Sequence, residues 1–211
     1  MSESFEFKIM RPFGPSIAKT KIPKNLLDKM NNYIDETIKV KKKINKFDHG
    51  PYLAGDVTQE FTLEKNFVEE IGWIKFLSNA VYEWIKKDTA KEISEFRLIS
   101  TWIVRQFKNE YNPIHTHSGH VSGVGYLKVP NHLGTTVQKN KKNNFGGHLN
   151  FIYGSQMFVN SSSIVIKPEV GDFYLFPNYL MHQVYPFKDT NEERRSVSFN
   201  AKIDQSIYDV Y

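Results

Sequence analysis

The C-terminal half of the chain consists of short apolar runs separated by turn residues. From Phe96 onward, β-branched and aromatic residues gather in segments bounded by Gly, Pro, Asn and Asp, a pattern typical of strands. We expect strands in the histidine-rich segment after Asn109 and at 97–107, 121–129, 147–153, 163–168, 171–176, 181–185 and 195–203. Many short strands at close spacing predict a sandwich, barrel or jelly roll rather than a parallel α/β sheet.

The N-terminal part of the chain carries helical periodicity instead. Apolar residues recur at helical spacing over Lys24–Lys42 and over Leu63–Lys87, so each segment is expected to form one amphipathic helix. Alternation over Phe5–Met10 predicts a short strand. The whole chain is then one domain, with a helical support region over 1–95 and a β core over 96–203.

Composition narrows the class of protein. With 211 residues, 40% of them hydrophobic and 14% aromatic, the chain can bury a core, which argues against wholesale disorder. It has no run of 18 apolar residues and no apolar segment at its start, so we expect neither a membrane span nor a signal peptide. It has no cysteine, which excludes disulfides and thiolate zinc sites and fits a cytoplasmic location.

The formal net charge of +5 leaves an acidic partner or substrate open. Much of the excess lies in two lysine clusters, Lys39–Lys43 and Lys139–Lys142, which we interpret as solvated turns and helix ends. Nucleic acid stays open as a partner, but no recognition motif for it is present. The sequence does not indicate an oligomeric state.

Three of the seven histidines lie close together, at His115, His117 and His120. Side chains two apart on a strand point to the same face, so His115 and His117 can converge on one point, whereas His120 has the other parity. Neutral imidazole is the commonest metal ligand and suits iron or zinc. The alternative is a surface or core pair without a metal.

A second group of polar residues stands near the C-terminus. His182 lies in an aromatic and aliphatic segment between Pro177 and Pro186, and Arg194 follows at the head of a new apolar run. His182 is either a further metal ligand or a buried histidine bonded to backbone. Arg194 is either a ligand-binding residue or half of a surface arginine pair balanced by neighbouring glutamates.

The order of these groups resembles a known family. The segments NPIHTHSG with SGVGYLKVP, GDFYLFPNYLMHQVYPF and ERRSVSFNA are similar to those of the double-stranded β-helix iron(II)/2-oxoglutarate oxygenases. The resemblance covers about 102–202 and is greatest to the small prolyl-hydroxylase-like members of marine bacteria and cyanophages. It implies a mostly β (α+β) fold, with a jelly-roll or cupin-like core buttressed by N-terminal helices.

The resemblance also implies an activity. Such a protein would be a 2-oxoglutarate-dependent dioxygenase with Fe(II) as its metal and 2-oxoglutarate as its cosubstrate. It would hydroxylate a protein side chain or a small metabolite while 2-oxoglutarate is oxidatively decarboxylated to succinate. A cyanophage protein of this kind would act in the host cytoplasm.

The expected metal ligands depart from the family pattern of two histidines and one carboxylate. If His115 is the first ligand, His117 takes the place of the carboxylate and a three-histidine site with His182 results. If His117 is the first ligand, that place falls to Gly119 and the site has two histidines. We prefer three, because His115 and His117 project from one strand face.

The remaining site residues are also implied by the resemblance. Arg194 would form a bidentate pair with the distal carboxylate of 2-oxoglutarate, and Ser196, on the same strand face, would donate a second hydrogen bond. Arg195 has the opposite parity and is expected to point outward. Tyr126 would contact the cosubstrate or serve as plain core.

Two other functions compete with the oxygenase. One is a cupin-like metalloenzyme that uses the three histidines without 2-oxoglutarate and therefore has no need of Arg194. The other is a jelly-roll binding module without catalysis, which predicts no metal stoichiometry.

Overall fold

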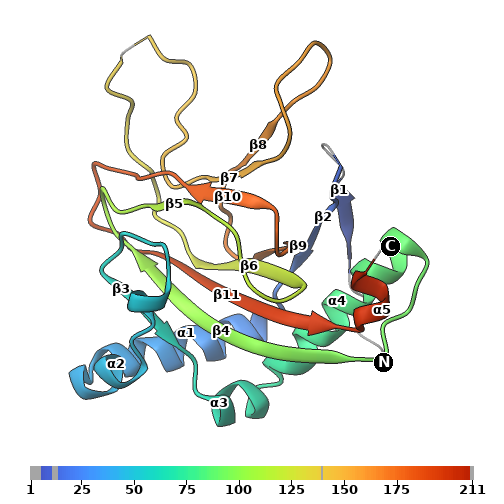
Figure 1. Ribbon diagram of the computed structural model, residues 1–211. Helices are drawn as coiled ribbons and strands as arrows, with labels where there is room; N and C mark the ends of the chain where they lie inside the picture. The colour runs from blue at the N-terminus through green and yellow to red at the C-terminus, as the bar shows by residue number, and fades with distance from the viewer. Residues whose placement is uncertain (1–5, 11–13, 139, 210–211) are drawn as a thin grey trace.

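Two antiparallel sheets form the body of the fold (Figure 1). The computed structural model describes residues 6–10, 14–138 and 140–209. Within these residues the large sheet has seven strands, in the order β1 (Lys8–Met10), β2 (Ile17–Lys21), β9 (Asp172–Pro177), β6 (Val121–Lys128), β11 (Arg194–Ile203), β4 (Phe96–Gln106) and β3 (Gln59–Thr62). The small sheet, in the same described part of the chain, has the order β5 (Asn112–His115), β10 (Met181–Val184), β7 (Leu149–Ile152) and β8 (Ser163–Ile166).

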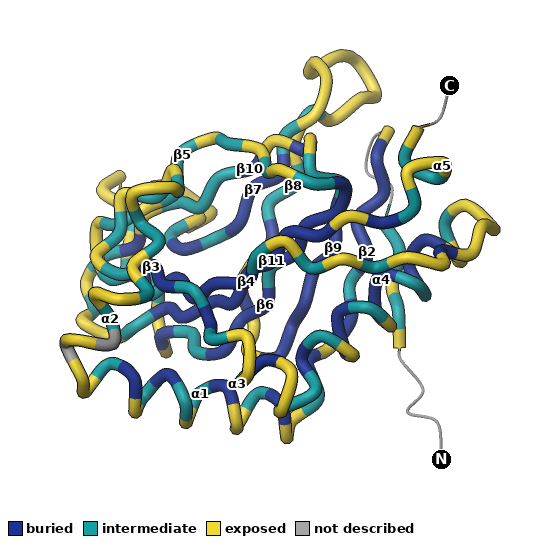
Figure 2. Tube along the Cα trace, turned by 60° about the horizontal axis from the view of Figure 1, so that its bottom comes forward, coloured by how far each residue is buried: buried dark blue, intermediate teal, exposed yellow. Residues whose placement is uncertain are grey.

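Helices cover the face of the large sheet that is turned away from the small one, as Figure 1 shows for α1 (Lys24–Ile38), α3 (Lys65–Glu70) and α4 (Trp73–Thr89). Three short elements complete the described part of the chain: α2 (Lys41–Phe47), η1 (Gly50–Tyr52) and α5 (Gln205–Tyr208). Buried residues line the sides of the helices that face the sheet, and exposed residues line the outer sides (Figure 2). No helix among the described residues combines the length and apolar character needed to cross a membrane.

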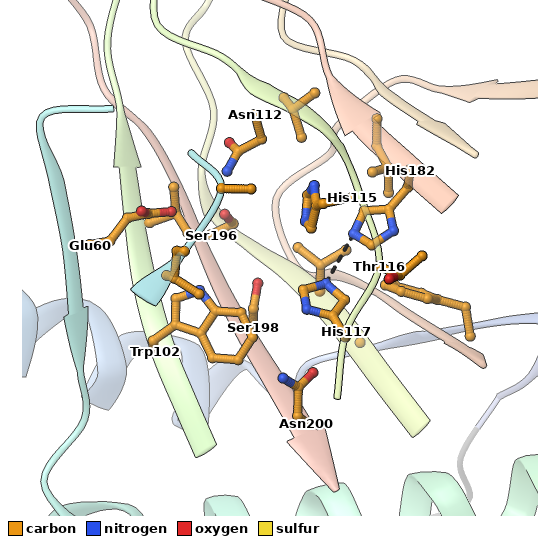
Figure 3. Close-up of a pocket in the computed structure, with 18 of the residues that line it drawn as sticks. Glu60, Trp102, Asn112, His115, Thr116, His117, His182, Ser196, Ser198 and Asn200 are labelled. Atoms are coloured by element: carbon orange, nitrogen blue, oxygen red, sulfur yellow. Dashed lines mark hydrogen bonds between the residues drawn. The ribbon is translucent and has the colours of Figure 1, made fainter. Parts of the chain in front are cut away.

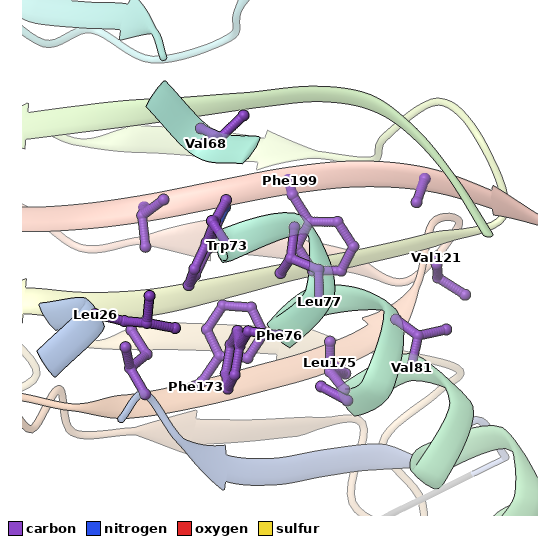
Figure 4. Packing of buried hydrophobic residues seen from close by; sticks show 14 of the residues in the cluster. Leu26, Val68, Trp73, Phe76, Leu77, Val81, Val121, Phe173, Leu175 and Phe199 are labelled. Atoms are coloured by element: carbon purple, nitrogen blue, oxygen red, sulfur yellow. The ribbon is translucent and has the colours of Figure 1, made fainter. Parts of the chain in front are cut away.

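The main core lies between the helices and the large sheet. Trp73 and Phe76 of α4 stack with ring centroids 5.2 Å apart, and both meet the edge of Phe173 on β9. Phe173 in turn stacks on Phe199 of β11 (Figure 4). All four side chains are at most 4% exposed, so this aromatic cluster fixes the helical layer against the centre of the sheet.

Strand β11 serves both faces of the large sheet. Its odd-numbered residues, among them Val197 and Phe199, belong to the core under the helices. Its even-numbered residues Arg194, Ser196 and Ser198 point to the opposite face, where the small sheet lies. Because side chains alternate along a strand, one segment supplies core and cavity at once.

The predicted helices are broken where single long helices were expected. The first ends at Ile38 and a separate α2 begins at Lys41. The second divides at Gly72, which has a φ of 83°; a left-handed residue cannot continue an α-helix. Helical spacing of apolar residues continues across both breaks, which is why periodicity alone missed them.

The N-terminal region contains more strands than the sequence indicated for residues 1–95. β2 and β3, which the sequence did not indicate, join the large sheet beside β9 and β4. β1 begins at Lys8, and Phe5 of the predicted first strand lies outside the described residues. The first 95 residues therefore contribute both edges of the large sheet as well as the helices.

Candidate metal centre and its cavity

Strand pairing brings together histidines that are far apart in sequence. β5 and β10 are antiparallel neighbours in the small sheet, and their register sets His115 directly opposite His182. His117 lies just beyond the end of β5. Its segment is held in place by Asn178: the His117 N–H donates to the Asn178 carbonyl at 2.9 Å, and the Asn178 amide donates to the His117 carbonyl at 3.2 Å.

The three imidazoles converge (Figure 3), and their potential ligand nitrogens all lie within 4.8 Å of one another. His115 Nδ1 donates to the Pro113 carbonyl at 2.7 Å, and His182 Nδ1 donates to the Leu180 carbonyl at 2.9 Å. These bonds fix the tautomer and leave Nε2 of each ring without a proton, the form in which histidine binds a metal. Nε2 of His117 lies 3.1 Å from Nε2 of His182.

Burial keeps these rings neutral. It lowers the pKa of His115, and it lowers the pKa of His117 to about 3, with the neighbouring His115 acting in the same direction. The pKa of His182 is held well below 6.5 by burial first and by the other two imidazoles second. Neutral imidazole is the form that coordinates a metal ion.

His120 and Gly119 lie elsewhere. The His120 ring stacks on Tyr208 with centroids 4.1 Å apart, and its Nδ1 accepts a hydrogen bond from the Ile203 N–H at 3.2 Å. Gly119 has a φ of 90°, and a Cβ there would lie 2.7 Å from the Ala201 carbonyl oxygen. Neither residue lines the cavity that the three histidines share.

Arg194 is buried at the start of β11 with only 1% of its surface exposed. Its Nε donates to the Gly147 carbonyl at 3.0 Å, its Nη1 donates to Gln106 Oε1 at 3.2 Å, and the guanidinium lies 5.0 Å from the centre of the Tyr126 ring. Nη2 has no hydrogen-bond partner among the described residues. Burial lowers the pKa of Arg194, and no described carboxylate pairs with it.

Arg194, Ser196 and the three histidines line one cavity of about 340 Å³. Its apolar walls come from both sheets and include Trp102, Val104, Val124, Leu149, Phe176 and Val184. Tyr126 is fully buried behind Arg194, its hydroxyl has no partner among the described residues, and it does not line the cavity. Its ring therefore packs against the Arg194 guanidinium and is not part of the cavity wall.

The structure differs from the expectation that Arg195 points outward into solvent. Arg195 points away from the cavity, as its parity predicts, but it is fully buried rather than exposed. Its guanidinium donates to Asp35 Oδ1 and Asn31 Oδ1 of α1 at 2.7 and 2.9 Å, and to both carboxylate oxygens of Glu193. The reason is that α1 covers this face of β11.

Several cavity residues were not predicted. Ser198 and Asn200 extend the alternation of Arg194 and Ser196 along β11, and that periodicity could have indicated them. Glu60 of β3 also lines the cavity, but its segment lacks any pattern that would mark it as part of a site.

Residues 100–200 match the family model described as "Putative 2OG-Fe(II) oxygenase". The matched segment contains the three histidines, Arg194 and Ser196. The match covers 101 of the 211 residues and supports the resemblance seen in the sequence. The predicted cofactors, Fe(II) and 2-oxoglutarate, are those after which the oxygenases are named, so that prediction is confirmed at the level of the family.

Solved structures share the fold of this chain. They include a prolyl-4-hydroxylase from Pseudomonas putida, with TM-score 0.57 and 13% identity over 87% of this chain and 91% of that chain. A second is the viral collagen prolyl hydroxylase of Paramecium bursaria Chlorella virus-1 in complex with 2-oxoglutarate, with TM-score 0.54 and 16% identity over 87% and 94% of the two chains.

A third is HygX from Streptomyces hygroscopicus with nickel, 2-oxoglutarate and hygromycin B bound, with TM-score 0.53 and 11% identity over 87% and 81% of the two chains. Together they confirm the predicted mostly β fold with a double-stranded β-helix core. A search of curated protein sequences found no match. The substrate, the cyanophage origin and the cytoplasmic location stay predictions.

Proposed function

We propose that this oxygenase hydroxylates a protein side chain or a small metabolite, consuming O₂ and converting 2-oxoglutarate to succinate and CO₂. The observation that carries the proposal is the meeting of three neutral imidazoles and a buried arginine with an unpartnered Nη2 in one cavity. Histidine nitrogens alone would suit many metal enzymes. The arginine adds a site for an anionic cosubstrate.

His115, His117 and His182 would hold the iron. The donor set fits a first-row divalent ion, because the three nitrogens are close together, neutral and, for His115 and His182, oriented by carbonyl acceptors. His117 stands where a carboxylate is usual. The two-histidine alternative is less favoured, since Gly119 packs against the Ala201 carbonyl outside the cavity.

Arg194 would bind the distal carboxylate of 2-oxoglutarate. The guanidinium is held from one side by Gly147 and Gln106, which leaves Nη2 for a ligand. A planar guanidinium binds a carboxylate through two parallel N–H bonds, a geometry that lysine does not reproduce. Ser196, two residues along the same face, would donate a second hydrogen bond.

Bound Fe(II) would supply oxygen activation coupled to decarboxylation of the cosubstrate. The chain's own residues position the reactants and exclude water. Phe176, Leu149 and Val184 form an apolar wall around the histidines, which strengthens polar contacts inside the cavity and limits side reactions.

The test is an anaerobic titration of the protein with Fe(II) and then 2-oxoglutarate, followed through the weak visible charge-transfer band of the chelate. We expect a band in the wild type. In Arg194→Ala the affinity for 2-oxoglutarate should fall by roughly 30-fold or more, because a buried charge-assisted contact is lost. Arg194→Lys keeps the positive charge but not the two parallel N–H donors of the guanidinium. Its affinity for 2-oxoglutarate is expected to lie between those of the wild type and Arg194→Ala.

Arg97→Ala is the matched control, since Arg97 is exposed on β4 of the same sheet. It should leave the band unchanged, and circular dichroism checks that each variant is folded. Iron binding without a band in the wild type would contradict the proposal and favour a metalloenzyme that does not use 2-oxoglutarate. Absence of iron binding would leave a non-catalytic binding module.

A further inference from the structure

The cavity contains a second charged residue that the proposed chemistry does not use. Glu60 lies on β3 opposite Val104 of β4 and is only 3% exposed. Figure 3 shows its carboxyl group reaching into the cavity on the side of Trp102, across from the histidines. Both carboxyl oxygens are buried without a hydrogen-bond partner among the described residues.

The surroundings of Glu60 do not compensate its charge. No described cation lies within ion-pairing distance of either oxygen. Arg105, the residue after Val104 on β4, is bound to Glu193 and Gln59 instead. Burial raises the pKa of Glu60 to about 7, with Asp48 acting in the same direction and the amide of Asn112 opposing it. A buried carboxyl group without a cation to compensate its charge destabilises the protein in the absence of a ligand.

We propose that Glu60 is the substrate anchor of this oxygenase and binds the ammonium or guanidinium group of a cationic substrate. The inference rests on the proposed function, because it gives a substrate-binding role to the part of the cavity that the metal ligands and Arg194 do not occupy. The two adjacent acceptor oxygens of Glu60 match the two parallel N–H groups of a guanidinium or two of the donors of an ammonium group.

The neighbouring walls fit the rest of such a molecule. Trp102 of β4, with Leu53 and Ala54 of the segment after η1, gives apolar surface beside Glu60. This surface suits the methylene chain of an alkylammonium or alkylguanidinium compound, and an indole face also attracts cations. Arg194 is the only other charged residue that lines the cavity within the described chain. The cavity thus separates a site for an anion, the cosubstrate, from a site for a cation.

The test measures binding of n-butylguanidinium and n-butylammonium chloride to the metal-free protein by isothermal titration calorimetry. Sodium chloride at equal ionic strength and n-butanol serve as control ligands. We expect saturable binding of at least one cation to the wild type and no comparable binding of n-butanol. Glu60→Gln should weaken cation binding by roughly 30-fold or more, since it removes the charge from a buried pair.

Glu70→Gln is the matched control variant, because Glu70 is an exposed carboxylate at the end of α3. It should bind the cations like the wild type. Glu60→Asp keeps the charge and should retain the preference for cations over n-butanol, which gives a second answer should the glutamine variant fold poorly. Equal affinity of wild type and Glu60→Gln, or no binding of either cation to the wild type, would overturn the proposal.

The iron titration distinguishes this proposal from the proposed function. The Glu60→Gln variant should still show the Fe(II)–2-oxoglutarate band. Glu60 lies on β3, and it is neither one of the proposed metal ligands nor a neighbour of Arg194 on β11. Absence of the band in the wild type would contradict the proposed oxygenase function, but it would not affect the binding of cations to Glu60. A normal band without cation binding that depends on Glu60 would contradict only the proposal that Glu60 anchors the substrate.

Discussion

Two adjacent arginines illustrate how the site is specified at the level of single residues. Arg194 and Arg195 are both fully buried, yet they lie on opposite faces of β11. Arg195 has Asp35 and Glu193 as ionic partners, whereas Arg194 contacts only neutral groups and keeps a free Nη2. A buried cation without an anion is costly unless a ligand supplies the charge. This difference supports the proposed role of Arg194 as the residue that binds the anionic cosubstrate.

His117 allows a direct test of the three-histidine ligand set. If His117 is the third ligand, in the place of the family's carboxylate, His117→Asp should retain iron binding by restoring two histidines and one acid. His117→Ala removes a ligand and should weaken iron binding by more than the roughly 10–100-fold that follows loss of an outer hydrogen-bond partner. Anaerobic Fe(II) titration measures both variants. His120→Ala is the control, and equal iron affinity in His117→Ala and wild type would exclude His117 as a ligand.

Glu60 makes the stability of the protein depend on pH. Its pKa rises from an ordinary value of 4.5 in the unfolded chain to about 7 in the folded protein, so the folded state binds more protons between these values. The contribution to the free energy of unfolding is complete below pH 4.5 and is lost as the pH rises through 7. The loss amounts to at most about 3 kcal/mol.

Urea denaturation of wild type and Glu60→Gln from pH 4.5 to 8.5 measures this loss. The wild type should become progressively less stable relative to the variant as the pH increases, because glutamine does not ionise. A difference that stays constant over this range would show that Glu60 keeps its ordinary pKa and does not carry a desolvated charge.

At the scale of elements, the metal centre depends on how strands and helices are joined. The register of β5 against β10 sets His115 beside His182, while the turn after β9 holds the segment of His117 through Asn178. On the other face of β11, α1 is attached through polar contacts to Arg195 as well as through its apolar stripe. The contacts that attach α1 and the candidate cofactor site thus lie on opposite faces of the large sheet.

Arg195→Ala should therefore destabilise the protein without affecting the site. The substitution removes the contacts with Asp35, Asn31 and Glu193, and although Lys128 and Arg105 still compensate the two acids, the expected loss is about 3 kcal/mol. Urea denaturation gives the free energy of unfolding. The Fe(II)–2-oxoglutarate band of the folded variant should be unchanged, and a weakened band would mean that the two faces of β11 are coupled.

Arg97→Ala again provides the comparison for stability. Arg97 is exposed, and its removal should change the free energy of unfolding by no more than about 0.5 kcal/mol. A similar loss in both variants would indicate a general effect of truncating arginines on these strands rather than the buried contacts of Arg195.

At the scale of the whole molecule, the cavity exists because two sheets and a helical layer are stacked. The helices bury one face of the large sheet, which leaves the other face for the small sheet and the polar residues of β11 (Figure 1). The first 95 residues take part in this arrangement on both sides: α1 and α4 support the sheet, and β3 contributes Glu60 to the cavity. They therefore do more than support the β core.

The sequence by itself determined the local properties of the protein. The alternation along β11 predicted that Arg194 and Ser196 share a face, because parity is a property of the extended backbone. Short strands with turns predicted the fold class, and the order of the histidine and arginine segments indicated the family. These inferences need no knowledge of which segments become neighbours.

Only the tertiary structure decided what lies beside each residue. It placed His182 opposite His115, covered Arg195 with α1 and brought Glu60 into the cavity. It also divided the second predicted helix at Gly72, where the chain changes direction to pack α4 on the sheet. Burial, register and charge compensation arise from contacts between distant segments, and the sum of many such contacts, rather than any local pattern, determines them.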